Sequence, residues 1–110
     1  TETVFPSENI TSSQTVSFVK GHYQIVQVGA NVTLTLTDWP DEGKMGRIRL
    51  QITSDGSDRT ITWQAAAGTF KSHSDWPSTF TVSDGETWIV DFWTINGGTT
   101  VFRQSYGSFS

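Results

Sequence analysis

The feature that most constrains the fold of this chain is a two-residue alternation of apolar and polar side chains in short segments. In residues 31–37 (NVTLTLT) every second residue is Val or Leu, and the others are Thr or Asn. Residues 47–53, 59–64 and 79–83 follow the same pattern. A helix would need apolar residues at intervals of three to four, so this alternation predicts β-strands with one buried face. It also explains an apolar content of only 35%, because Thr and Ser occupy many outward positions.

The connections between these segments carry the residues that tight turns require. Residues 96–98 (Asn-Gly-Gly) predict a hairpin, since Asn and Gly adopt positive φ at low cost. Asp-Gly pairs in residues 54–58 and 83–85 predict similar turns. Less regular strands are expected at residues 14–19, 22–28 and 99–106. About seven to nine short strands predict an all-β fold, an antiparallel β-sandwich or jelly-roll-like domain.

The chain divides into an extended N-terminal arm, residues 1–14, and a β-sandwich domain, residues 15–110. The arm shows neither a period of two nor one of 3.6. Two interpretations of it are open: the Phe5-Pro6 pair docks on a neighbouring molecule, or the segment is a frayed terminus.

Length and composition exclude several functional classes. A chain of 110 residues fits one domain, and without cysteine it has no disulfide, zinc ribbon or thiol nucleophile. A net charge of −4 with seven scattered Lys and Arg argues against nucleic-acid binding. The longest apolar run is too short to cross a membrane.

No catalytic residue, metal site or cofactor is expected. Ser72, His73 and Asp75 are the residue types of a catalytic triad, but neighbours in a polar segment indicate a solvated loop. Asp55 and Asp58 flank a glycine turn and supply too few oxygens for calcium. The acidic residues around Trp39 are interpreted as solvated charges.

Residues 86–95 depart from the alternation, because both faces of this strand are apolar. Trp88, Val90 and Phe92 share one face, while Ile89 and Trp93 lie on the other, on either side of Asp91. Such a strand is either central in a sheet and covered on both sides, or it shows one face to a partner. With Trp88 on the core side, Trp93 is the best candidate for an interface residue.

Two other tryptophans, Trp39 and Trp76, each precede a proline at the entrance of a loop. In one interpretation they close the open ends of the sandwich. In the other they form a binding platform for a sugar ring or for another subunit.

Several short motifs follow one another along the chain: LTLTDWP, GRIRLQI, DGSDRTITW, Phe70-Lys71, Trp76-Pro77, Gly85 with residues 88–92, and NGGT at residues 96–99. As an ordered series they resemble a β-domain common in virion proteins of tailed bacteriophages, including tail fibres and small capsid decoration (cement) proteins. The resemblance covers about residues 30–106. Gln64 follows Trp63 where the pattern has Pro, and residues 1–14 lie outside the pattern.

The resemblance implies a non-enzymatic structural protein of the virion, most often a homotrimer, which binds the major capsid protein or other virion proteins. If Thr1 follows a removed initiator Met and residues 1–110 are the whole product, the chain is too short for a fibre with its own shaft. A decoration protein that stabilises the capsid is then expected. If the chain is a fragment, a tail-fibre, receptor-binding or carbohydrate-binding domain becomes the better interpretation, with a host-surface glycan as a partner.

Overall fold

The computed structural model describes residues 4–110, with side chains from residue 9 onward, and within this range the chain forms ten β-strands and one short 3₁₀ helix. The elements are β1 (Val4–Ile10), β2 (Gln14–Ser17), η1 (Phe18–Lys20), β3 (Tyr23–Val28), β4 (Val32–Thr37), β5 (Gly46–Ser54), β6 (Arg59–Ala65), β7 (Thr69–Ser72), β8 (Phe80–Val82), β9 (Thr87–Thr94) and β10 (Thr100–Phe109).

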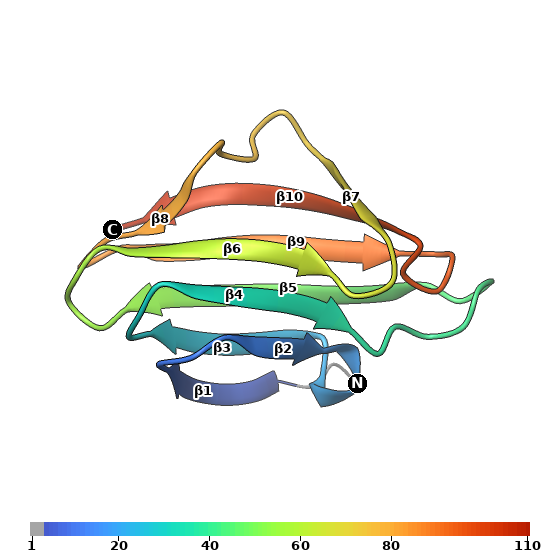
Figure 1. Cartoon of the computed structure of the whole chain (residues 1–110), viewed down its shortest axis with the longest axis horizontal. Helices are drawn as coiled ribbons and strands as arrows, with labels where there is room; N and C mark the ends of the chain where they lie inside the picture. The colour runs from blue at the N-terminus through green and yellow to red at the C-terminus, as the bar shows by residue number, and fades with distance from the viewer. Residues whose placement is uncertain (1–3) are drawn as a thin grey trace.

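The strands form two sheets that pack face to face (Figure 1). The larger sheet has the order β1-β3-β5-β9-β10-β7, and the smaller has the order β2-β4-β6-β8. The all-β sandwich predicted from the sequence is thereby confirmed.

Alternating side chains of both sheets fill the space between them. Leu34 and Leu36 of β4 face Ile48, Leu50 and Ile52 of β5 across this core, and all five are fully buried. The polar residues between them point outward, as the alternation predicts. An aromatic group widens the core toward one long edge and consists of Trp63, Phe70, Trp76, Phe80, Trp88 and Phe92.

The expected antiparallel pairing needs correction, because most neighbouring strands are parallel. From β1 to β9 the chain passes to the other sheet after every strand, so strands two apart in sequence become neighbours. Hence β1, β3 and β5 run parallel in one sheet, as do β2, β4 and β6 in the other; β7 is also parallel to β10. Within residues 4–110 only β5/β9, β9/β10 and β6/β8 are antiparallel.

The physical reason is that the alternation of apolar and polar residues predicts which face of a strand is buried. It does not predict whether the neighbouring strand runs parallel or antiparallel. The Asp-Gly turns at residues 54–58 and 83–85 join strands of different sheets, whereas residues 96–98 form the expected hairpin between β9 and β10.

The N-terminal segment expected as an arm is extended, but residues 4–10 are the edge strand of the larger sheet. β1 pairs with β3, and Ile10 is 2% exposed in the core. The register of this pairing shifts between Phe5 and Glu8, around Pro6. An edge strand tolerates this proline because one side of its backbone has no strand to bond.

Candidate interaction surface

The outer face of the larger sheet gathers aromatic and arginine side chains over its central strands. The described chain has only two layers, so the side of this sheet turned away from the core is a surface of the molecule. We call this surface the aromatic–arginine face and define it by residues Tyr23, Met45, Arg47, Arg49, Gln51, Asp91, Trp93, Phe102, Gln104 and Tyr106.

The strand register places these side chains in rows. Arg47 of β5 lies opposite Trp93 of β9, which in turn lies opposite Phe102 of β10. The rings of Trp93 and Phe102 stack with centroids 5.9 Å apart and planes inclined by 16°. Met45, 60% exposed, borders the same shallow pocket as Arg47 and Trp93, which has a volume of about 220 Å³.

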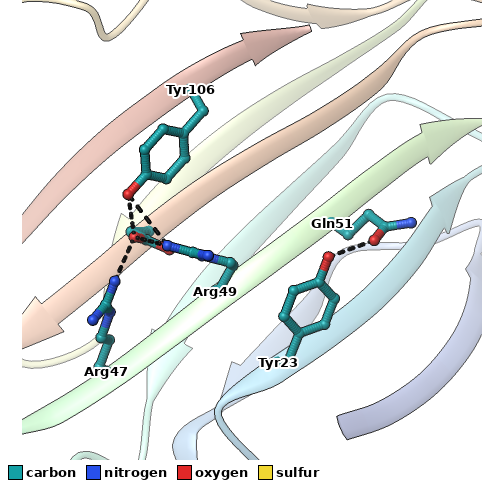
Figure 2. A network of polar contacts seen from close by, with 6 residues as sticks. Tyr23, Arg47, Arg49, Gln51 and Tyr106 are labelled. Atoms are coloured by element: carbon teal, nitrogen blue, oxygen red, sulfur yellow. Dashed lines mark hydrogen bonds and ion pairs between the residues drawn. The ribbon is translucent and has the colours of Figure 1, made fainter. Parts of the chain in front are cut away.

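Asp91 lies at the centre of the next row, opposite Arg49 on one side and Gln104 on the other. Arg49 donates to its two carboxylate oxygens, from Nε at 2.8 Å and from Nη2 at 3.1 Å. Arg47 Nη2 donates to Oδ2 at 3.0 Å, and the Tyr106 hydroxyl donates to the same oxygen at 2.9 Å. Figure 2 shows these groups converging on one carboxylate. Their cover leaves Asp91 1% exposed, although it points away from the core.

The charges of this network are strongly coupled. Burial alone would raise the pKa of Asp91, but the hydrogen bonds from Arg49, Tyr106 and Arg47 outweigh it and hold the pKa below its ordinary value. The hydrogen bond to Asp91 raises the pKa of Arg49. Asp91 is therefore a carboxylate at neutral pH, and its partners occupy both oxygens.

This occupancy decides what the arrangement can do. A general base needs a free lone pair within reach of a substrate proton, and the oxygens of Asp91 are covered by three partners. The arginine side chains instead remain 52% exposed at Arg47 and 38% exposed at Arg49. The network thus holds two cations in place, and both retain solvent-accessible surface for a partner.

A second polar pair extends this face toward β3. The Tyr23 hydroxyl donates to Gln51 Oε1 at 2.5 Å, beside the Asp91 network (Figure 2). Tyr23 lies opposite Arg49 in the strand register. The polar groups of β3, β5, β9 and β10 are thus arranged side by side on one surface.

The structure separates the residues that the sequence singles out. Trp93 lies on the aromatic–arginine face, and Trp88 packs against the core, as expected.

Trp39 packs against Phe18 where β4 ends. Trp76 packs against Trp63 and other rings of the aromatic group. Phe5 and Pro6 belong to β1, and their side chains lie outside the described part of the structure.

Both Trp39 and Trp76 are partly buried and contact the core, in separate aromatic clusters. Trp39 fits over two glycines: a Cβ added at Gly46 would lie 2.8 Å from its ring, and one added at Gly98 would lie 2.5 Å from it. The structure thus gives Trp39 a packing role where the chain leaves β4.

The groups considered for catalysis or metal binding have local partners. His73 Nδ1 lies 3.3 Å from Asp75, and both side chains are at least half exposed, while Ser72 Oγ accepts a hydrogen bond from Arg103. Asp55 pairs with Arg59. Residues 4–110 contain no cluster of three or more potential metal ligands, and none of their helices is long and apolar enough to span a membrane.

Sequence reasoning missed the arginines and Tyr106 as members of this surface. Asp91 between apolar residues was the available signal, because a charge in such a strand needs a partner. Its partners come from β5 and β10, and the choice of neighbouring strands is set by the fold as a whole.

Comparisons of the chain with family models, with curated proteins and with solved structures find no match.

Proposed function

We propose that this chain is a non-enzymatic virion structural protein, a capsid decoration protein that self-associates, as a trimer, and binds the capsid shell through the aromatic–arginine face. The observation that supports this proposal is the outer face of the larger sheet, where the stacked rings of Trp93 and Phe102 lie beside two arginines that are paired with Asp91. The motif resemblance supports a role in a bacteriophage particle. The arrangement of side chains on the aromatic–arginine face supports its use as a contact surface.

The composition of this face is that of a protein interface. Trp, Tyr, Phe, Met and Arg are enriched at protein–protein interfaces, and Trp, Tyr and Arg dominate binding hot spots. The face has one or more of each type. Beyond the rows described above, Ile95, directly after β9, is 60% exposed, and Phe109, at the end of β10 and opposite Thr87, is 52% exposed.

The Asp91 network makes this face better suited to binding. A free arginine loses rotamer entropy when a partner immobilises it, but Arg49 is already fixed by two hydrogen bonds to Asp91. The face also carries a local excess of positive charge, with two arginines around one aspartate, in a chain of net charge −4. A partner surface with exposed carboxylates would complement it.

The alternative function, a tail-fibre or receptor-binding domain, has less support from the tryptophans named for it. Trp39 and Trp76 are both partly buried against the core, so neither is an open platform for a sugar ring; Trp76 instead forms part of the wall of a pocket.

Sedimentation equilibrium tests self-association. Two substitutions on the aromatic–arginine face and one control in the smaller sheet test whether this face is the contact. We expect Trp93→Ala and Arg47→Glu to weaken the oligomer at least about tenfold, because each removes a central contact. Arg59→Glu makes the same charge change in the smaller sheet and should leave association unchanged. A wild-type protein that is monomeric at high concentration would contradict the self-association.

Binding to the shell is tested by mixing the protein with capsids that were assembled in its absence. We expect co-sedimentation and a higher temperature of capsid disruption, both reduced in Trp93→Ala. Capsids that neither bind the protein nor gain heat resistance would overturn the decoration role, whatever the oligomeric state.

A further inference from the structure

Arg103 occupies an unusual position at the edge of the aromatic group. It lies opposite Phe92 in the register of β10 and β9, so its side chain is on the core side of the sheet. Its guanidinium carbon lies 4.3 Å from the ring centroids of both Phe70 and Trp76. Nε donates to Ser72 Oγ at 2.7 Å. Burial among these groups lowers the pKa of Arg103.

This cation differs from the other arginines in having no counter-charge among the described residues. Arg47 and Arg49 pair with Asp91, and Arg59 pairs with Asp55. No carboxylate in the described part of the chain lies within ion-pair distance of Arg103. Partial burial of an uncompensated charge is unfavourable, and stacking on two rings offsets only part of this cost. An anion beside Arg103 would complete the arrangement.

A pocket of about 290 Å³ adjoins Arg103. It lies where β8 begins, with Phe80 opposite Ile61, and where β6 continues beyond this pair. The residues that line it include Trp76, Pro77, Arg103 and four residues with hydroxyl groups, Thr60, Thr62, Ser78 and Thr79. The Thr60 hydroxyl lies 3.4 Å from that of Thr81.

We propose that this pocket binds a carboxylate-bearing sugar, such as a sialic or uronic acid, with the carboxylate on Arg103. The Nη groups of Arg103 have no partner among the described residues, and a planar guanidinium binds a carboxylate through two parallel hydrogen bonds. The serine and threonine residues of the lining are suited to hydrogen bonding with sugar hydroxyls, and Trp76 with Pro77 provides an apolar wall for the C–H groups of the ring.

Charge favours this ligand over other anions. A phosphate or a nucleic acid would bring more negative charge than one arginine compensates, toward a chain that is already acidic. A simple carboxylate would make no use of the serine and threonine residues in the lining. This site is separate from the aromatic–arginine face, so the proposal does not depend on the decoration role.

The test is a titration of the ¹⁵N-labelled protein, followed by NMR, with the methyl glycosides of N-acetylneuraminic acid and glucuronic acid. Methyl glucoside serves as the neutral ligand and acetate as the bare carboxylate. We expect saturable shifts at the Trp76 indole and the Arg103 Nε, with at least one acidic glycoside binding about tenfold tighter than methyl glucoside. That ratio is the usual contribution of a hydrogen bond to a charged group.

Two variants and one control locate the site. Arg103→Gln should weaken the acidic glycoside about tenfold or more, and Thr62→Val, an exposed residue on the pocket wall, should weaken it without disturbing the core. Lys71→Gln removes the same charge from the neighbouring strand and should leave binding unchanged. If Arg103→Gln does not fold, Thr62→Val and the map of shifts still decide the question.

Three results would overturn the proposal. One is the absence of binding by either acidic glycoside at millimolar concentrations. Another is binding that both pocket variants leave unchanged, which would place the ligand elsewhere. The third is acetate binding as tightly as the acidic glycosides, which would mean that the pocket recognises a carboxylate and no sugar.

Discussion

At the residue scale, Asp91 links the strands of the larger sheet on its outward side. Its side chain is 2% exposed, and it binds side chains from β5 and β10, the two neighbours of β9. A buried carboxylate whose partners are removed becomes strongly destabilising, whereas a fully bonded one is tolerated. The position therefore couples the stability of the sheet to pH.

We predict that part of the free energy of unfolding is lost in acid through Asp91. Its pKa in the folded state lies below its ordinary value of 3.8, so this contribution is complete above pH 3.8 and disappears as the pH falls through the lower, folded-state pKa. Urea unfolding followed from neutral pH to about pH 2 measures the effect.

Asp91→Asn is the control for this pH dependence, because it removes the titrating group. The variant should be less stable at neutral pH by about 2–3 kcal/mol and should show a shallower loss in acid. Parallel stability curves for the two proteins would contradict the assignment to Asp91.

Gly98 is the second residue whose replacement has a sharp expected outcome. Its φ is +91°, and an added Cβ would lie 2.5 Å from Trp39 Cδ1. Gly97→Ala is the matched control, since Gly97 also has a positive φ of +71° but its nearest atoms are 3.7 Å away. We expect about 1–2 kcal/mol of destabilisation at Gly97 and about 1–3 kcal/mol more at Gly98, measured by thermal unfolding. Equal losses would mean that Trp39 moves aside at no cost.

At the element scale, the two strands that the sequence did not predict are both edge strands of the larger sheet. β1 contains a proline and a register shift, and β7 has exposed or half-exposed residues at all four positions, so neither shows an alternation. The regular strands were predicted to within one or two residues, because each buries one face. Strand direction and the Asp91 partners depend on which strands become neighbours, and a local pattern holds no information on that choice.

β1 offers a prediction at this scale, because a strand contributes to stability and a free arm does not. Ile10→Ala should destabilise the protein by about 2–4 kcal/mol, since Ile10 is 2% exposed in the core. Asn9→Ala changes the exposed neighbour in the same strand and should change stability by less than about 0.5 kcal/mol. Chemical denaturation compares the stabilities of the two variants with that of the wild type. An unchanged unfolding midpoint for Ile10→Ala would show that β1 does not unfold cooperatively with the rest of the protein.

At the scale of the whole molecule, the regular alternation between sheets makes nearly all strand pairings non-local. Apart from the β9/β10 hairpin, each strand pairs with a neighbour at least two elements away in the chain. Loops must close before these pairings can form.

We therefore predict slow refolding for a chain of this size. Domains dominated by non-local β pairing fold in about milliseconds to seconds, and stopped-flow fluorescence of the five tryptophans can follow this process. Refolding complete within microseconds would contradict the role given to topology.

The passage of the chain back and forth between the sheets also has an architectural consequence. Among β1 to β6, each pair of consecutive strands adds one strand to each sheet. The pair β1 and β2 lies at the end of this series, at one edge of both sheets (Figure 1). Within the described part of the chain, this end of the sandwich therefore presents an open strand edge in each layer, β1 in the larger sheet and β2 in the smaller. Open edges are where a further strand can pair.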